Sequence, residues 1–159
     1  MAIATVRDIM EKDVVVVHPE TSIFDAHEIL ESHRFDGVPV VDAAHRLVGI
    51  LTEYDLIVKG SSLHLPTFQK ILNELDAFKK DRLQFSEDAA TLQRLTVHDV
   101  MNADPLTFSE DITLEEVVAV FRDHHRVNPI PVITADKTVV GIVSRYDVLK
   151  LFAIIRPVS

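Results

Sequence analysis

A hydroxyl residue stands three positions before an aspartate at two places in the sequence, in the pairs Thr52 with Asp55 and Ser144 with Asp147. A carboxylate can accept hydrogen bonds from two hydroxyl groups of one ligand. A hydroxyl beside the free N–H groups of a helix start can face a phosphate. The same spacing also caps a helix without any ligand, because the carboxylate then faces the positive end of the helix dipole. The two roles are compatible.

Both pairs belong to a longer internal repeat. The sequence VGILTEYDL at Val48–Leu56 reappears as VGIVSRYDV at Val140–Val148, and TVRDIM at Thr5–Met10 reappears as TVHDVM at Thr96–Met101. The second copy gains a single residue between these two stretches. An ordered duplication of this kind predicts two similar halves around a pseudo-twofold axis. Such halves leave two related clefts between them, and clefts are where ligands bind.

Each copy is predicted to contain a helical turn, a strand, a helix, two paired strands and a final helix. β-branched runs indicate strands, and apolar residues at helical spacing behind a hydroxyl residue indicate helices. The predicted elements are strands at 14–17, 38–41 and 47–51 with helices after Ser22 and Thr52, and strands at 106–108, 130–134 and 139–143 with a helix after the capping box Thr113–Glu116.

These elements divide the chain into a first repeat at 1–60, a helical insert at 61–95 and a second repeat at 96–159. The insert contains an amphipathic stripe after Pro66, which either covers a flank of the molecule or recognises a partner protein. The apolar tail at 149–155 either completes the core or a dimer seam, or docks on a partner.

Composition narrows the class of protein. The chain has 159 residues, of which 47% are hydrophobic and 26% charged, as in ordinary soluble globular proteins. Its net charge of −9 argues against binding to nucleic acid, which needs clustered Lys and Arg. No apolar run approaches the roughly 20 residues of a membrane span, so we expect no membrane insertion. The absence of cysteine and of a secretory signal fits a cytoplasmic protein.

The repeated motif resembles that of the tandem CBS domain, or Bateman module. It consists of a glycine, two hydrophobic residues and Thr/Ser-x-x-Asp, preceded by a hydrophobic-Pro-Val strand, and the resemblance covers about 6–58 and 97–151. It implies an α/β (α+β) fold of two pseudo-twofold-related CBS repeats, each a small sheet of about three strands packed with two helices. It also implies regulatory binding of adenosine-containing ligands such as AMP, ADP, ATP or S-adenosylmethionine, no catalysis, and a homodimer.

In this family each cleft combines both repeats. The resemblance implies that the Asp binds the ribose hydroxyls, that Thr or Ser with helix N–H groups faces a phosphate, and that apolar side chains hold the purine. The residues expected to bind ligand in one cleft are Ser144, Arg145, Asp147, Val16, Val17, His18, Gly37, Val38 and Pro39, and those in the other are Thr52, Asp55, Thr107, Phe108, Pro129, Ile130 and Pro131.

The charges near the two motifs differ. Arg145 lies inside the second motif, where the first has Glu53, so we expect the Ser144/Asp147 cleft to be the better anion site. The Thr52/Asp55 cleft could be weaker, select a less charged ligand, use Mg²⁺ or stay empty. The eight histidines show no metal-binding spacing, so we expect no metal site and no obligatory cofactor.

Three functions remain open at this point. The leading hypothesis is a stand-alone ligand-sensing module that acts in trans on an unknown partner protein. The alternative is a protein-interaction or dimerisation module whose clefts are vestigial and bind no nucleotide. An enzyme acting on nucleotides is disfavoured, because the sequence has no Walker loop, no cysteine nucleophile and no metal-ligand cluster.

Overall fold

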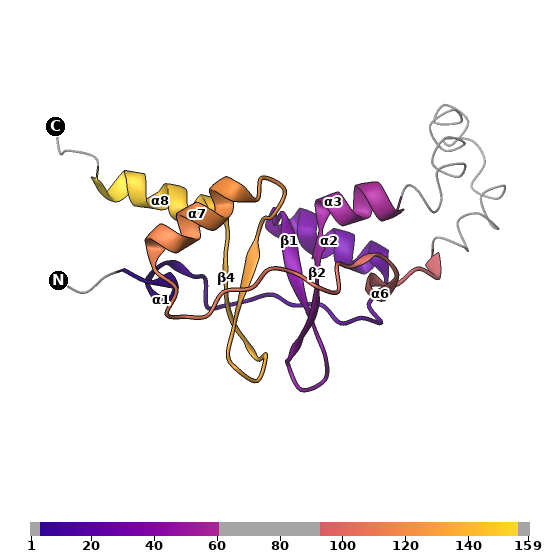
Figure 1. The fold of residues 1–159 in the computed structure, drawn as a ribbon. Coiled ribbons are helices and arrows are strands. Elements are labelled where there is room, and N and C mark those ends of the chain that lie inside the picture. The colour runs from indigo at the N-terminus through magenta and orange to yellow at the C-terminus, as the bar shows by residue number, and fades with distance from the viewer. Residues whose placement is uncertain (1–3, 61–92, 156–159) are drawn as a thin grey trace, which may run out of the picture.

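Two β-hairpins stand side by side at the centre of the molecule (Figure 1). The computed structural model describes residues 4–60 and 93–155 of the chain. β1 (Gly37–Val41) pairs antiparallel with β2 (Leu47–Thr52), and β3 (Ile130–Ile133) pairs antiparallel with β4 (Val139–Val143). These hairpins confirm the predicted strand pairs and the mixed helix-and-strand fold.

The first predicted strand of each repeat is reduced to a single bridging residue. Val17 makes one parallel bridge to β1, where its N–H donates to the carbonyl of Pro39 over 3.0 Å. The next ladder hydrogen bond on that side would need an N–H on Pro39, which proline lacks. Phe108 makes the equivalent single bridge to β3 beside Pro131. Each sheet therefore has two full strands and a third segment that pairs at one point, instead of three strands.

Capping side chains set where the helices begin. Ser22 Oγ accepts from the N–H of Asp25 at the start of α2 (Ile23–His33), and Thr113 Oγ1 accepts from Glu116 at the start of α7 (Leu114–Asp123). Glu116 completes the predicted capping box by accepting from the N–H of Thr113. The other described helices are α1 (Val6–Ile9), α3 (Glu53–Asp55), its π-helical continuation η1 (Leu56–Gly60), α6 (Val97–Val100) and α8 (Arg145–Ile155).

The two repeats exchange their first helical turns. In Figure 1, α1 lies beside α7 and α8 of the second repeat, and α6 lies beside α2 of the first. Accordingly Val6 of α1 is fully buried in the core of the second repeat, and Val97 and Val100 of α6 are fully buried in the core of the first. Each hydrophobic core is thus completed by the other repeat, which ties the two halves together.

Glycine is required where each exchanged turn meets a strand. A Cβ at Gly49 of β2 would lie 2.8 Å from the carbonyl oxygen of Asn102, and a Cβ at Gly141 of β4 would lie 3.0 Å from Cγ of Met10. Such contacts are shorter than packed carbon atoms tolerate. The repeated glycine therefore marks close packing between the repeats, and both glycines have φ outside the left-handed region.

Equivalent residues of the two repeats also meet at the pseudo-twofold axis. The amide Nδ2 of Asn128 donates to Oδ2 of Asp36 over 2.6 Å. Gly37 lies against the equivalent Pro129, and a Cβ on Gly37 would lie 2.8 Å from Cδ of that proline. The same Asn128 accepts from the N–H of Arg145 through its Oδ1 over 2.9 Å, so it connects Asp36, just before β1, to the start of α8.

The predicted insert helix lies outside the described residues. The apolar tail is described as far as the end of α8, and its side chains Leu149 and Phe152 are 57% and 71% exposed. Leu149 and Phe152 therefore do not complete the core of this chain. Among the described residues, no helix is long and apolar enough to cross a membrane.

Candidate functional site: two clefts between the repeats

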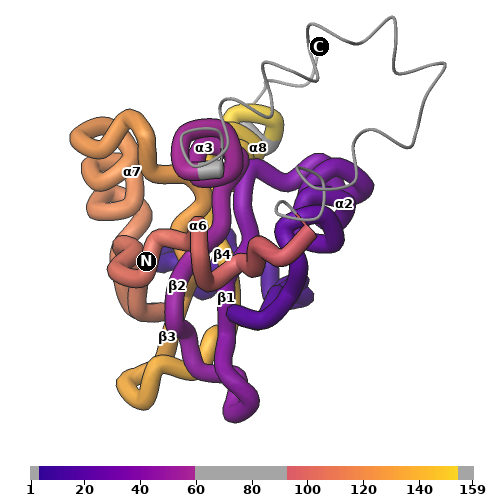
Figure 2. The backbone as a smooth tube through the Cα atoms, turned by 90° about the vertical axis from the view of Figure 1, so that its right-hand side faces the viewer, coloured from indigo at the N-terminus to yellow at the C-terminus, as the bar shows by residue number. Residues whose placement is uncertain are grey.

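Two cavities of about 360 Å³ each lie between the repeats. The first, the α8 cleft, places the start of α8 opposite residues 11–15 and 33–38 of the first repeat. The second, the α3 cleft, places the start of α3 opposite residues 102–106 and 124–129 of the second repeat. Figure 2 shows α3 and α8 at the same end of the molecule, away from the hairpin loops. The predicted pair of related clefts is therefore present.

Each cleft contains a buried carboxylate held by a helix start. Asp147 is 9% exposed, and its Oδ2 accepts from the N–H of Ser144 over 2.8 Å and from its hydroxyl over 2.9 Å. Asp55 is 6% exposed, and its Oδ2 accepts from the N–H of Thr52 over 3.1 Å and from its hydroxyl over 2.7 Å. Both motifs thus form capping boxes.

The second oxygen of each carboxylate faces a lysine. Nζ of Lys150 lies 2.9 Å from Oδ1 of Asp147, and Nζ of Lys59 lies 3.3 Å from Oδ1 of Asp55. The hydrogen bond to Asp147, with the attraction between the two charges, raises the pKa of Lys150. Each Oδ1 is therefore paired with the ammonium group of a partly exposed lysine, and Lys59 also donates to the carbonyl of Met101 over 3.2 Å.

Two further capping boxes in the chain help to separate capping from ligand binding. Thr5 with Asp8 and Thr96 with Asp99 have the same spacing, and each carboxylate likewise accepts from the N–H of its threonine over 2.8 Å. Their carboxylates are exposed and line neither cleft. Capping alone does not require a buried carboxylate beside a cavity, so burial at Asp55 and Asp147 needs a second explanation.

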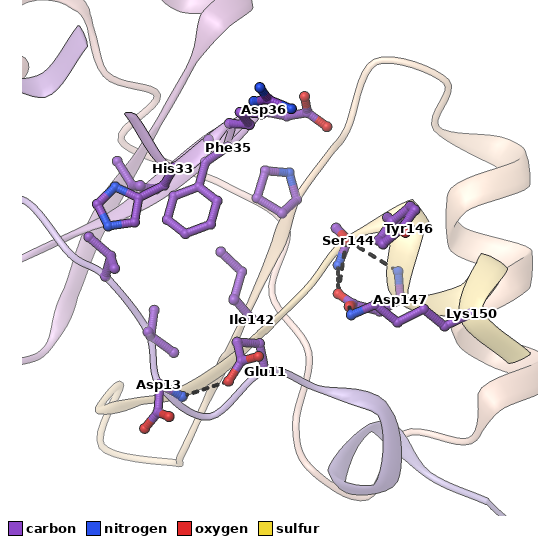
Figure 3. A pocket seen from close by; sticks show the side chains of 16 residues that line it. Glu11, Asp13, His33, Phe35, Asp36, Ile142, Ser144, Tyr146, Asp147 and Lys150 are labelled. Carbon is purple, nitrogen blue, oxygen red and sulfur yellow. Dashed lines mark hydrogen bonds and ion pairs between the residues drawn. The ribbon is translucent and has the colours of Figure 1, made fainter. Parts of the chain in front are cut away.

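Side chains of both repeats line the α8 cleft (Figure 3). His33 and Phe35 stack with ring centroids 4.9 Å apart, and in Figure 3 they face Ser144 and Asp147 across the pocket, with Ile142 between them. An aromatic and aliphatic wall of this kind suits the face of a purine. Of the residues predicted for this cleft, those that line it are Ser144, Asp147, Gly37 and Val38.

The remaining residues predicted for this cleft lie elsewhere. The segment before α2 contributes Val14 and Val15, two residues earlier than predicted, because Val17 is 2% exposed within the core. Val16 packs against the small core at the hairpin tips, and Nδ1 of His18 makes a hydrogen bond with the carbonyl of Val41 over 3.0 Å. Pro39 is buried within β1 and does not line the cleft.

In the α3 cleft, the predicted residues Thr52, Asp55 and Pro129 line the cavity. Phe108 does not, since it is 4% exposed and packs edge-on against Phe121 in the core. The other predicted residues that do not line it are Ile130 and Pro131, which are buried in β3, and Thr107, which is exposed outside the cavity.

Arg145 lines neither cleft, and its guanidinium is bonded to backbone carbonyls. Its Nη2 donates to the carbonyls of His124 over 2.9 Å and His125 over 2.6 Å, and its guanidinium stands 5.7 Å from the ring centre of Phe121. Those carbonyls follow the end of α7, where helix carbonyls need donors. Arg145 therefore does not contribute the cation that was expected in the Ser144/Asp147 cleft, and which cleft binds anions better stays a prediction.

The charged residues that line the two clefts make the α3 cleft, and not the α8 cleft, the less negative of the two. The α3 cleft contains Lys59 and Arg126, which balance the formal charges of Asp55 and Asp104. Arg126 is exposed, and its Nη1 donates to the hydroxyl of Tyr54 over 3.3 Å at the rim of the cleft. In the α8 cleft, two cations stand against four carboxylates; the charged residues are Arg34, Lys150, Glu11, Asp13, Asp36 and Asp147.

The lysines and Arg126 were missed by the sequence reasoning. Lys59 and Lys150 each lie one helical turn after the motif aspartate, a spacing at which a cation reaches a carboxylate on the same helix face. That signal was present in the sequence. For Arg126 no local signal places the guanidinium beside Tyr54, because the two residues come from different repeats.

A pair of repeats with exchanged first turns and a Thr/Ser-x-x-Asp cleft on each side defines the class of protein with paired CBS domains. The CBS domain model matches residues 6–61 and 97–154, so the chain belongs to the CBS domain family. This membership confirms the resemblance drawn from the repeated motif.

Similar proteins include plant and other CBS pairs. CBSX1, a chloroplastic CBS domain-containing protein of Arabidopsis thaliana, is 30% identical over 152 residues, and the match covers 92% of this chain and 63% of that protein. The chain thus spans less than two thirds of this relative. The crystal structure of CBSX2 from Arabidopsis thaliana in complex with AMP has a TM-score of 0.70 at 27% identity and covers 97% of this chain and 99% of that chain.

A second similar structure contains other adenosine compounds. The CBS domain pair of protein MJ0100, solved in complex with 5′-methylthioadenosine and S-adenosyl-L-methionine, has a TM-score of 0.68 at 26% identity. That match covers 98% of this chain and all of the other. CBS pairs similar to this chain over nearly its whole length thus include ones solved with adenosine-containing molecules.

Proposed function

We propose that this chain is a regulatory module that binds adenosine-containing ligands in the α3 and α8 clefts. The observation that carries the proposal is the pair of buried carboxylates, Asp55 and Asp147, each held by one oxygen and lining a cavity. Similar CBS pairs solved with AMP, 5′-methylthioadenosine and S-adenosylmethionine support the same ligand class.

The binding chemistry follows from the free side of each carboxylate. Oδ1 of Asp55 or Asp147 accepts hydrogen bonds from the ribose hydroxyls once the lysine ammonium moves aside. Hydrogen bonds to a charged group of this kind contribute about 1.5–3 kcal/mol each. In the α8 cleft the purine lies against Val38, Phe35 and Ile142, which are among the apolar residues that line the cavity.

The clefts suit regulation because each is built from both repeats. A ligand that contacts the start of α8 and the 33–38 segment stabilises one relative position of the two repeats over others. A partner protein that distinguishes these positions would read the ligand concentration. We therefore propose that the module acts in trans on such a partner.

Two equivalent helical surfaces support assembly of two copies. α8 exposes Tyr146, Leu149 and Phe152, with exposed fractions of 68%, 57% and 71%, and the α3–η1 segment exposes Tyr54 and Val58. Large apolar side chains gathered on neighbouring helices are typical of an interface. We propose that these helices form a homodimer.

A thermal-shift panel on nucleotide-stripped protein tests the proposed function. The panel contains adenosine, AMP, ATP with and without Mg²⁺, and S-adenosylmethionine. A ligand at 100 times its dissociation constant adds about 2.7 kcal/mol of stability, which raises the melting temperature by a few degrees. We expect a shift for at least one ligand, and its loss in the double variant Asp55→Asn/Asp147→Asn.

The matched control is the double variant Asp8→Asn/Asp99→Asn. It removes two carboxylates from capping boxes of the same kind that line neither cleft, so its ligand shifts should equal those of the wild type. A flat panel with wild-type protein would contradict the proposal and favour an interaction module with vestigial clefts. Equal loss in both double variants would show that the clefts are not the sites.

A further inference from the structure

The charge difference between the clefts comes from two pairs of equivalent positions. Glu11 bridges to Ile142 of β4 as Asn102 bridges to Ile50 of β2, so Glu11 and Asn102 occupy equivalent places. Asp36 and Asn128 are likewise equivalent, and they bond to each other at the pseudo-twofold axis. At both places the α8 cleft has a carboxylate where the α3 cleft has a neutral amide.

The remaining charges of the two clefts match in number and sign. Asp13 corresponds to Asp104, Arg34 to Arg126, and each motif aspartate has its own lysine. The formal charge of the lining residues is therefore zero in the α3 cleft and −2 in the α8 cleft. A phosphate group in the α8 cleft would be repelled by two additional carboxylates within the same cavity of about 360 Å³.

The α3 cleft also has a cation placed at its rim. The guanidinium of Arg126 stands 5.8 Å from the ring centre of Tyr54 and bonds to its hydroxyl. Both residues line the cavity, and Arg126 is exposed, so a phosphate can reach the guanidinium without breaking a buried ion pair.

We propose that the two clefts sort adenosine ligands by charge. The α3 cleft binds a 5′-phosphorylated adenosine nucleotide, and the α8 cleft binds an adenosine compound without phosphate, either uncharged or cationic at its 5′ substituent. The inference rests on the proposed function and assigns a ligand class to each cleft. Two different metabolites can then bind one module at the same time, one in each cleft.

Titration calorimetry with AMP, adenosine and S-adenosylmethionine tests the assignment. We expect AMP to bind wild-type protein at one site per chain, with at least a 10-fold loss of affinity in Asp55→Asn and less than a threefold change in Asp147→Asn. S-adenosylmethionine should show the opposite pattern. Loss of AMP binding in Asp147→Asn, or two equal AMP sites in the wild type, would overturn the proposal.

A charge variant tests the cause. Glu11→Gln/Asp36→Asn gives the α8 cleft the side-chain chemistry of the α3 cleft, so the ratio of AMP to adenosine affinity at that site should rise about 10-fold. The control Glu20→Gln/Glu28→Gln removes the same net charge from exposed positions that line neither cleft. An equal effect of both double variants would contradict a local cause.

Arg126→Gln provides an independent measurement at the α3 cleft. It should weaken AMP about 10-fold while changing adenosine less than threefold, because adenosine has no phosphate for the guanidinium to bind. Arg122→Gln removes an exposed guanidinium from α7 that pairs with Asp123, and AMP affinity should be unchanged.

If none of the three ligands binds wild-type protein, the proposed function fails as a whole. Binding with the wrong distribution between clefts contradicts only the sorting.

Discussion

At the scale of single residues, each motif aspartate uses its two oxygens differently. Oδ2 of Asp147 is occupied by the N–H and hydroxyl of Ser144, whereas Oδ1 is paired with the ammonium of Lys150. The Lys150 side chain is 57% exposed, so this ion pair contributes little to stability. A ribose that binds Oδ1 must displace the lysine, which makes Lys150 a competitor of the ligand.

Removing that competitor should strengthen binding. Exposed ion pairs contribute about 0.2–1 kcal/mol, so Lys150→Met should raise the affinity for adenosine by up to about fivefold. Titration calorimetry at pH 8 measures the change. Lys137→Met, at an exposed lysine of the β3–β4 turn, is the matched control and should have no effect. A weaker affinity in Lys150→Met would mean that the lysine contacts the ligand instead of competing with it.

At the scale of elements, the exchanged first turns make each sheet depend on the other repeat. Met10 follows α1 and packs on Gly141 of β4, and Met101 follows α6 and packs on Gly49 of β2. The backbones on either side are also bonded, since the N–H of Glu11 donates to the carbonyl of Ile142 over 2.9 Å. The methionine side chain therefore fits against the strand only because the strand residue, Gly141 or Gly49, has no side chain of its own.

Gly141→Ala should disturb this contact. Overfilling a packed interior costs about 1–3 kcal/mol, so the free energy of unfolding should fall by that amount. Urea denaturation followed by circular dichroism measures the change. The double variant Gly141→Ala/Met10→Ala should recover part of the loss if the clash with Met10 is the cause, because the smaller side chain restores space. If the double variant loses as much unfolding free energy as the Gly141→Ala and Met10→Ala variants lose together, the clash with Met10 is not the cause.

The sequence predicted the elements that depend on local pattern. Capping residues correctly predicted the starts of α2 and α7, and β-branched runs correctly predicted the strands of both hairpins. Both signals depend on residues that are close together in the sequence. It did not predict the role of Arg145, whose partners are carbonyls at the end of α7 about 20 positions away. It also did not predict that Pro39 stops the pairing of the third strand with β1 after one bridge. Whether a proline nitrogen faces a neighbouring strand depends on how the strands pair in the fold. The net charge of each cleft could not be predicted from the sequence, because its charged residues come from both repeats and only the fold brings them together.

At the scale of the whole molecule, both clefts lie where α3 and α8 begin, and both exposed helical surfaces start at the same places. Tyr146 lines the α8 cleft and is 68% exposed, and Tyr54 lines the α3 cleft and is 46% exposed. The same helices thus connect the ligand sites to the proposed dimer surface. A ligand that shifts the start of α8 would also change the surface offered to a second copy or to a partner.

A charged side chain on this surface should prevent assembly. Phe152→Asp places a carboxylate on the exposed face of α8, so wild-type protein should sediment as a dimer and the variant as a monomer. Sedimentation velocity at several protein concentrations measures the difference. Ala43→Asp, in the exposed hairpin turn at the opposite end of the molecule, should remain dimeric. A monomeric wild-type protein, or an equally dimeric Phe152→Asp variant, would contradict the dimer proposal.

The most direct test of the account is a crystal structure of the chain grown with saturating AMP. We predict electron density for AMP in the α3 cleft, with both ribose hydroxyls within hydrogen-bonding distance of the Asp55 carboxylate and the phosphate beside Arg126. Lys59 should then have moved away from Oδ1 of Asp55. AMP bound with its ribose away from both motif aspartates, or no AMP in either cleft at saturation, would contradict the account.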